Sequence, residues 1–355
     1  MRCACEAKSE PPVPSIAQNN IKMKHIGIDL GTANTIIYMK GKGIVLREPS
    51  VVAVDLKGKY AIAVGREAKM MLGKTPGSIK ALCPLKNGVI AEFDATSAML
   101  RHFLKKVSCN TIFSRPKAVI GIPYGVTEVE RRAVEDVALE AGVQSVALIE
   151  EPLAAAIGAG LRIEDARGSM IVNIGAGTTE VAVLSYGGIV LSTSMRTAGN
   201  QIDEAIAGYI KKKYNVMIGE VTSEVLKKSI GSAHPSFDKG MMEVRGRNLQ
   251  NGLPAILNIS SAEVREAMVG SIMTIIEGIK NTLENTPPEL SSDIYDTGIV
   301  LSGGGALLPG LDQMIAHYTG IRTFVAKNPL DCVAHGIGRA IEGGGLADVV
   351  TFRTR

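Results

Sequence analysis

The chain has 355 residues, more than one hydrophobic core usually accommodates, so two domains are expected. Hydrophobic residues make up 46% and charged residues 21%, a globular composition that excludes a mainly disordered chain. The net charge of +4 is too small to indicate nucleic-acid binding, and no stretch approaches the roughly 18–20 apolar residues of a membrane span. The five cysteines form neither a disulfide framework nor a zinc motif, which favours the reducing cytoplasm.

The N-terminal segment comes before the ordered pattern. Residues 1–22 carry a proline cluster and no hydrophobic periodicity, so we expect a disordered leader. The pattern typical of regular structure begins just after Met23.

The stretch Ile26–Tyr38 predicts a strand, a tight turn and a second strand. Asp29 stands near the end of the first strand, and Gly31 and Thr32 lie in the turn. Successive backbone N–H groups of such a turn can point at a phosphate, while the carboxylate faces a hydrated metal ion. Taken alone, these residues also fit an ordinary β-hairpin.

The remainder of the first half predicts a core with a small insertion. Thr127 and Glu130 form a capping box that opens a helix ending at Gly142, with Val129 expected on its buried face. The small residues of a helix over 153–160 should allow close packing. Other expected elements are two strands in 43–55, an inserted segment over 56–85 with a helix near 66–72, a helix capped by Thr96, and a strand over 117–123.

Met170–Leu184 repeats the order of the first hairpin. An apolar strand carrying Asn173 leads into a turn of glycine and threonine, and a second apolar strand follows. Two matching hairpins indicate a duplicated domain. If the two turns face each other across a cleft, they would clamp the phosphates of a nucleotide, which is a more specific signal than either turn alone.

The second half predicts a second insertion and a glycine-rich turn. Helices over 199–214 and 223–228 and a hairpin over 241–259 come before a long helix capped by Ser260 and ended by Pro287 and Pro288. A strand over 298–302 then runs into Gly303–Ala306. Such a turn allows close backbone approach to a ligand, or is needed for a tight turn on steric grounds alone.

Together these stretches resemble the actin, sugar-kinase and heat-shock-chaperone ATPases and, among them, the family of bacterial actin homologues that includes MreB and Mbl. The resemblance extends from about residue 23 to about residue 342. The stretches that carry it are Ile26–Asn34, Glu48–Ala53, Ile149–Gly158, Gly177–Ala182, Thr286–Leu290 and Ser302–Leu308.

The resemblance implies an α/β architecture, the actin-like ATPase fold, with two duplicated ribonuclease-H-like lobes that each carry a small inserted subdomain. The expected boundaries are a leader over 1–22, a lobe I core over 23–55 and 86–165, an inserted subdomain IB over 56–85, a lobe II core over 166–200 and 261–345, an inserted subdomain IIB over 201–260, and a mobile tail over 346–355.

The resemblance also implies ATP and Mg²⁺ between the lobes. Asp29 and Asn173 would face the metal through water, and Glu151 would polarise the attacking water with help from Thr178. For Glu151 the alternative is an ordinary carboxylate at a helix N-terminus. The residues expected at the nucleotide are Gly31, Thr32, Ala33, Asn34, Gly175, Ala176, Gly177, Thr178, Thr179, Gly199, Glu224, Lys227, Gly303, Gly304, Gly305 and Ala306.

Three positions depart from the family pattern. The family has Asp where this chain has Asn173, Gly where it has Ala176, and usually Asp where it has Asn200. Asn173 keeps the hydrogen-bonding shape but removes one negative charge. We therefore expect weaker metal binding and slow ATP turnover.

By resemblance, the protein is expected to be a cytoskeletal ATPase that determines rod shape. It would form filaments on the inner face of the cell membrane and organise cell-wall synthesis with the membrane proteins RodZ, MreC and MreD, without nucleic acid. Ile112 and Phe113 correspond to a loop that inserts into lipid, at about 1.5–3 kcal/mol for each side chain. A loop folded onto its own domain is the alternative.

Three other functions compete with this one. A nucleotide-locked scaffold would polymerise with little hydrolysis, which Asn173 favours. A small-molecule kinase of the same superfamily would need a substrate pocket with a catalytic base, for which the sequence carries no separate signal. A chaperone-type ATPase would need a peptide-binding domain after the ATPase, and the sequence ends at Arg355.

Overall fold

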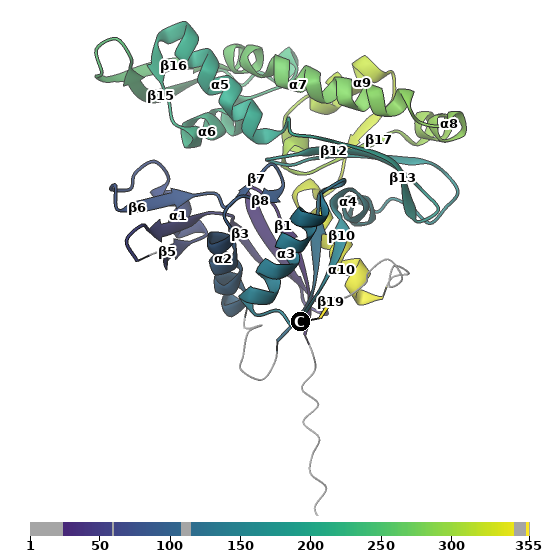
Figure 1. Ribbon diagram of the computed structural model, residues 1–355. Coiled ribbons are helices and arrows are strands. Elements are labelled where there is room, and N and C mark those ends of the chain that lie inside the picture. The colour runs from purple at the N-terminus through teal and green to yellow at the C-terminus, as the bar shows by residue number, and fades with distance from the viewer. Residues whose placement is uncertain (1–23, 59, 108–114, 344–352, 355) are drawn as a thin grey trace, which may run out of the picture.

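The computed structural model describes residues 24–58, 60–107, 115–343 and 353–354. Figure 1 shows two lobes, one above the other, each built around a mixed sheet with helices on its faces. We call the lower one lobe I and the upper one lobe II. The leader over 1–22 and the loop with Ile112 and Phe113 lie outside the described residues.

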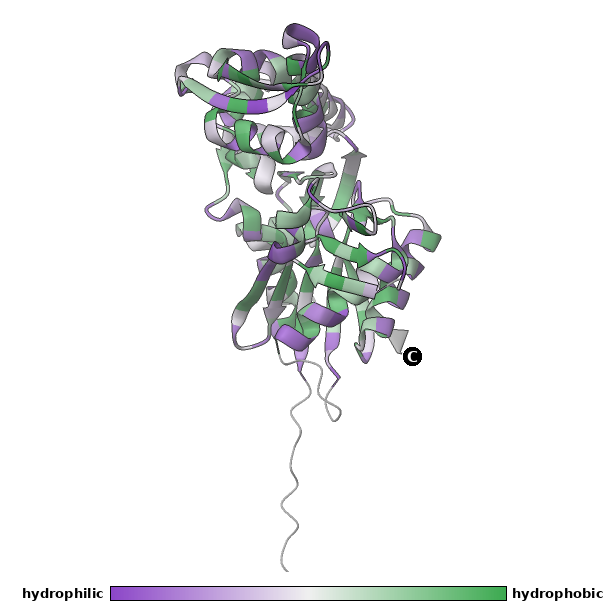
Figure 2. Cartoon of the chain, turned by 90° about the vertical axis from the view of Figure 1, so that its left-hand side faces the viewer, coloured by the Kyte–Doolittle hydropathy of each residue, from purple (hydrophilic) through white to green (hydrophobic). Residues whose placement is uncertain are grey.

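A six-stranded sheet organises lobe I. Strand β1 runs parallel to β9 and antiparallel to β2, so that Ile28 lies opposite Ile37 in the hairpin. In Figure 2 the strands of this lobe are mainly green, the colour of hydrophobic residues. The strands in order are β19 (Arg353–Thr354), β10 (Ser145–Glu150), β9 (Lys117–Ile122), β1 (His25–Leu30), β2 (Asn34–Met39) and β3 (Gly43–Pro49).

Two helices pack together on one face of this sheet. They are α2 (Phe93–Lys106) and α3 (Glu128–Ala141), and their buried side chains share a core with Ile26, Ile28 and Ile120. The expected start of α2 was wrong, because the helix begins three residues before Thr96, whose hydroxyl donates to the Glu92 carbonyl from inside the first turn.

The capping box of α3 is confirmed, but one expected core position of that helix is not. Thr127 accepts from the Glu130 amide, and the Glu130 carboxylate accepts in return from the Thr127 amide. Val129 was expected on the buried face, yet it is 78% exposed, because the second position of the helix points away from the sheet.

Lobe II repeats the central hairpin of lobe I. Its β11 pairs antiparallel with β12 and parallel with β17, as β1 pairs with β2 and β9. The duplication predicted from the two turns is therefore confirmed in the strand pairing. The strand order is β13 (Gly188–Met195), β12 (Thr179–Ser185), β11 (Ser169–Ile174), β17 (Ile299–Ser302) and β18 (Thr323–Val325).

Helices α7 (Ser261–Glu284), α8 (Pro288–Thr297) and α9 (Leu311–Thr319) belong to this lobe. The capping box at Ser260 is present, as predicted. Helix α8 was not expected from the sequence; it begins at Pro288, three residues after the C-cap of α7 at Asn285. Pro288 occupies the first helical position, where a missing N–H costs nothing.

Each lobe carries a small subdomain with a three-stranded sheet. In lobe I the order is β5 (Tyr60–Val64), β4 (Val52–Asp55) and β6 (Ile79–Leu82), beside α1 (Arg66–Met71). The boundary expected at residues 55 and 56 passes through this sheet, because β4 pairs with β5 and β6. In lobe II the sheet is β14 (Val216–Met217), β15 (Met241–Asn248) and β16 (Pro254–Ser260), beside α5 (Gly199–Tyr214) and α6 (Glu220–Ile230).

Two closely packed helices join the lobes. They are α4 (Glu151–Ala159) and α10 (Cys332–Glu342), and their core includes residues of both large sheets, such as Ala147 and Ile171. A Cβ atom on Gly158 or Gly336 would lie 1.8 Å from a backbone oxygen of the opposite helix. The expectation that small residues bring this helix close to a neighbour is therefore confirmed.

Of the mobile tail expected over 346–355, the structure describes only residues 353 and 354. Residues 353 and 354 form β19 and pair antiparallel with Ser145 and Val146 of β10. This pairing covers backbone groups that would otherwise form a free sheet edge. No helix within the described ranges is both long and apolar enough to cross a membrane.

Candidate functional site

The two duplicated turns lie against each other where the lobes meet. A Cβ atom on Gly177, in the turn of lobe II, would be 2.5 Å from the Thr32 hydroxyl oxygen in the turn of lobe I. Both Thr32 and Thr178 are buried. The structure thus brings together the two stretches, 31–34 and 175–179, that the sequence analysis paired.

A third turn, which the sequence analysis did not single out, completes this arrangement. Strands β7 (Leu85–Lys86) and β8 (Val89–Ile90) form a hairpin whose tip is Asn87-Gly88. The Gly88 amide donates to the Thr32 hydroxyl at 3.1 Å, and a Cβ on Gly177 would be 2.9 Å from the Asn87 Cα. Both tip residues have positive φ, as a two-residue hairpin turn requires. The Asn-Gly pair between two short strands was the signal for this turn.

The N-terminus of α5 is attached to the turn of lobe II. The Gly199 amide donates to the Gly175 carbonyl at 3.1 Å, and the Asn200 amide donates to the Ala176 carbonyl at 2.8 Å. The helix therefore directs the positive end of its dipole at this turn. A helix N-terminus beside a glycine turn favours an anionic group such as a phosphate.

The glycine-rich turn after β17 packs against the end of β11. Gly303 has a φ of 81°, and a Cβ there would be 2.3 Å from the Ile174 carbonyl oxygen. A Cβ on Gly305 would lie 2.2 Å from the Ile174 side chain, whereas at Gly304 the nearest atom is 3.3 Å away. Steric crowding against Ile174 is therefore enough to explain why residues 303 and 305 are glycines. Ala306 is buried in the lobe II core.

Three acidic side chains lie beside these turns, Glu151 and Glu180 buried and Asp29 partly buried. Burial, followed by the charge of Asp331, raises the pKa of Asp29 to about 7. Burial also raises the pKa of Glu180 to about 7. For Glu151 burial is again the main cause, and the charges of Glu180 and Asp29 add to it, so that its pKa is well above the usual value. The structure thus brings Asp29 and Glu151 into one electrostatic environment.

The side chain of Asn173 is buried and hydrogen-bonded within the protein. Its side-chain oxygen accepts a hydrogen bond from the Ser302 hydroxyl at 3.1 Å. In the β11–β12 pairing it stands directly opposite Glu180, and its side chain lowers the pKa of that carboxyl against the effect of burial. Asn173 is therefore occupied by protein partners.

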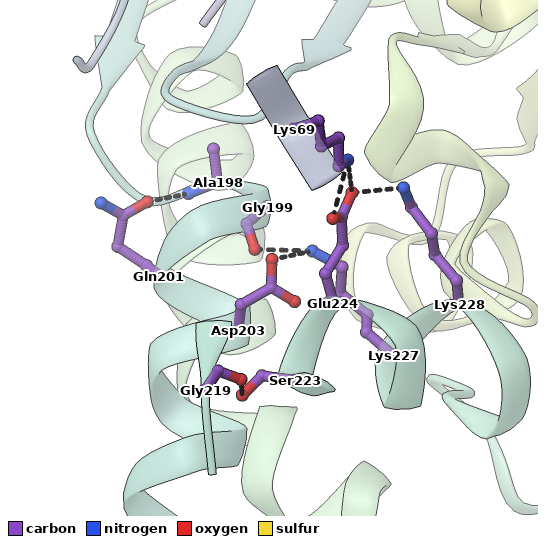
Figure 3. Close-up of polar contacts among 10 residues, drawn as sticks. All are labelled: Lys69, Ala198, Gly199, Gln201, Asp203, Gly219, Ser223, Glu224, Lys227 and Lys228. Carbon is purple, nitrogen blue, oxygen red and sulfur yellow. Dashed lines mark hydrogen bonds and ion pairs between the residues drawn. The ribbon is translucent and has the colours of Figure 1, made fainter. Parts of the chain in front are cut away.

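Glu224 and Lys227 lie on α6 and have partners from other elements (Figure 3). Glu224 accepts from Lys69 of α1 at 3.0 Å and also from Lys228. The pair with Lys69 connects the two small subdomains. Lys227 donates to the Gly199 carbonyl at 2.7 Å and to Asp203 at 2.8 Å, which fixes α6 against the start of α5. No motif or spacing in the sequence pointed to Lys69.

The donor set beside the turns is compatible with Mg²⁺. Asp29 is a partly buried carboxylate with a raised pKa and no cation among the causes of that shift, so a divalent ion would stabilise its charged form. In the part of the chain that the structure describes, no three His, Cys, Asp or Glu side chains gather as a metal site. Mg²⁺ commonly uses only one or two carboxylates and takes its other ligands from water and phosphate.

Comparison with known proteins identifies the family. A family profile described as MreB/Mbl protein matches residues 23–346, which is most of the chain. The chain belongs to the MreB/Mbl family. The relationship suggested by the sequence stretches is thereby confirmed.

Named members of the MreB/Mbl family align over nearly their full length. The cell shape-determining protein MreB of Escherichia coli (strain K12) is 51% identical over 322 residues, covering 89% of this chain and 93% of the relative. The cell shape-determining protein Mbl of Bacillus subtilis (strain 168) is 48% identical over 315 residues, covering 89% and 95%.

Solved structures of MreB proteins share the fold. MreB 5 of Spiroplasma citri bound to AMPPNP has a TM-score of 0.86 and 39% identity, covering 90% of this chain and 96% of that one. The MamK double helical filament has a TM-score of 0.73 at 22% identity, which supports the fold alone. The actin-like ATPase fold expected from the sequence is confirmed, and the relatives from Escherichia coli and Bacillus subtilis are named cell shape-determining proteins.

Proposed function

We propose that this MreB/Mbl family member binds ATP and Mg²⁺ between its lobes, and that the bound nucleotide controls its assembly into filaments. The observation that carries the proposal is the contact between Thr32 and Gly177, which places one glycine turn from each lobe at the same point. Two Spiroplasma citri MreB 5 structures are bound to AMPPNP and to ADP, which supports the same ligand class here.

In this proposal each part of the site has a separate task. The backbone N–H groups of the two turns bind the phosphates, and the positive end of the α5 dipole favours their negative charge. Mg²⁺ would be held through Asp29 and water, and would neutralise the phosphate charge. Glu224 and Lys227 lie near the base and ribose, with Lys69 fixing Glu224 from the other lobe.

Hydrolysis in this site would depend on positioning and charge rather than covalent chemistry. Glu151, at the first position of α4, would polarise the attacking water, and Thr178 would orient that water. Because Asn173 contributes no charge and is engaged by Ser302, we propose slow turnover. A scaffold that polymerises on ATP with little hydrolysis remains the second candidate, and the same contact of Asn173 favours it.

The filaments would lie on the inner face of the cell membrane and organise cell-wall synthesis, with RodZ, MreC and MreD as partners. The expected lipid contact is the pair Ile112 and Phe113. Replacing both with Ser should release filaments from liposomes in co-sedimentation while leaving polymerisation in solution unchanged. Equal co-sedimentation of the variant and the parent protein would rule out this contact.

The test of the proposed function is electron microscopy of purified protein with Mg²⁺ and ATP, AMPPNP or no nucleotide, together with phosphate-release measurements. Filaments that require nucleotide, with phosphate release slower than assembly, are the expected result. Filaments of equal number and length without nucleotide, or no nucleotide binding at all, would contradict it.

A further inference from the structure

Glu180 follows the turn of lobe II by one residue and is fully buried. It lies on β12 and so is part of the same rigid hairpin as Gly177 and Thr178. A buried carboxylate is costly unless it is hydrogen-bonded. The partners of this side chain therefore indicate what it does in the structure.

The carboxylate of Glu180 reaches across to lobe I. One oxygen accepts the backbone amide of Tyr124 at 2.8 Å. Tyr124 lies in the connection between β9 and α3, two residues after the end of β9. The bond thus joins the phosphate turn of one lobe to a loop of the other.

That loop is next to the proposed catalytic carboxylate. In the parallel pairing of β9 and β10, Ile122 lies beside Glu150, and a Cβ on Gly121 would be 3.4 Å from the Glu151 side chain. Pro123 lies between β9 and Tyr124, and a Cβ on Gly88 would approach its ring to 2.6 Å and the Thr178 methyl to 3.2 Å. Glu180 is two residues from Thr178, and Tyr124 is three residues from Gly121, which packs against Glu151. The interlobe hydrogen bond therefore has one end near each of these two residues.

We propose that Glu180 is a positioning residue for ATP hydrolysis, which holds Thr178 of lobe II in register with Glu151 of lobe I through the Tyr124 amide. Asn173 assists from the opposite strand, where its uncharged side chain faces the Glu180 carboxyl. This inference rests on the proposed function for its catalytic part, but the interlobe bond is a property of the protein alone.

The test compares Glu180→Gln, which keeps an oxygen acceptor, with Glu180→Met, which has a similar length and no such acceptor. Hydrogen–deuterium exchange without nucleotide reports the bond. In the parent protein and in Glu180→Gln, the Tyr124 amide should exchange about tenfold or more slowly than the exposed Gly125 amide, and Glu180→Met should remove this difference. In phosphate release with saturating ATP, Glu180→Met should lower kcat about tenfold and Glu180→Gln should retain most of it.

Glu48 provides a matched control outside the cleft. It is also a buried glutamate that accepts a backbone amide, that of Arg66 at 3.1 Å. Glu48→Met should lower thermal stability without changing kcat for bound ATP, which separates positioning from a general loss of stability.

Three results would overturn the inference. These are a Tyr124 amide that exchanges as fast as Gly125 in the parent protein, equal losses of kcat in Glu180→Gln and Glu180→Met, and a kcat in folded Glu180→Met equal to that of the parent. If Glu180→Met does not fold, two measurements still test the inference. Slow exchange of the Tyr124 amide in the parent protein and a largely retained kcat in Glu180→Gln support it, and the opposite of either result overturns it. If the parent protein binds no ATP, the proposed function fails, and Tyr124 exchange still tests the interlobe bond.

Discussion

In lobe I the strand before the turn carries Asp29, whereas in lobe II the equivalent strand carries Asn173. The backbones around the two residues repeat each other, with the same antiparallel hairpin and the same parallel neighbour. The chemistry differs, because Asp29 is a partly buried acid with a raised pKa and Asn173 is already bonded to Ser302. The duplication therefore supplies two similar glycine turns, and at this strand position lobe I has an acid where lobe II has an amide.

The largest expected effect comes from separating the two turns. Gly177→Val would place side-chain atoms where Thr32 and the Asn87 backbone now lie. We expect nucleotide affinity to fall by about a hundredfold, or about 2.8 kcal/mol, in a fluorescent-nucleotide titration. Gly270→Val is the control, because a Cβ there meets no atom within 4 Å. Equal affinity for both variants would mean that the turns do not act together.

The next largest effect is expected when Asp29 of lobe I is replaced by Asn, the residue that lobe II has at the equivalent position. Asp29→Asn removes the carboxylate that is proposed to hold the cation through water. We expect the affinity for Mg²⁺–nucleotide to fall by about tenfold or more, and the melting temperature without nucleotide to rise at neutral pH, because a partly buried charge is lost. A Mg²⁺ titration and a thermal melt measure the two. Unchanged Mg²⁺ dependence would place the cation elsewhere.

The reverse substitution gives lobe II the acid that lobe I carries at the equivalent position. Asn173→Asp adds a carboxylate opposite Glu180, and like charges on facing strand positions repel. We expect a lower melting temperature without Mg²⁺ and nucleotide, and phosphate release that is about tenfold faster with both. If the variant hydrolyses ATP at the parent rate, Asn173 does not limit turnover.

Much of this comparison was accessible from the sequence because it depends on local patterns. The hairpins around Asp29 and Asn173, and the capping boxes at Thr127 and Ser260, each involve residues close together in the chain. The start of α2 was missed because Thr96 resembles a helix cap, although it bonds back to Glu92.

The contacts that complete the site could not be predicted in this way. Lys69 and Glu224 are 155 residues apart, and Tyr124 and Glu180 are 56 apart. Only the folded arrangement brings them together, and neither the type nor the spacing of these residues in the sequence indicates the pairing. Asn87-Gly88 did carry a turn signal, but its position between the other two turns depends on the packing of the lobes.

The smallest expected effect is the pH dependence of stability without nucleotide. The pKa values of Asp29 and Glu180 are each raised to about 7, so the folded protein binds more protons than the unfolded chain between about pH 4 and pH 7. The stability they contribute is therefore complete below the unfolded pKa values and is lost as the pH rises through 7. We expect the melting temperature to fall by a few degrees from about pH 5 to about pH 8. Asp29→Asn should reduce this fall, and an equal slope in both proteins would contradict the assignment.

Hydrogen–deuterium exchange with and without Mg²⁺–AMPPNP tests the central claim most directly. If one turn from each lobe binds the same triphosphate, the amides of 31–34 and of 175–179 should both become protected at the same nucleotide concentration. Protection confined to one of the two turns, or no protection at saturating nucleotide, would contradict the account.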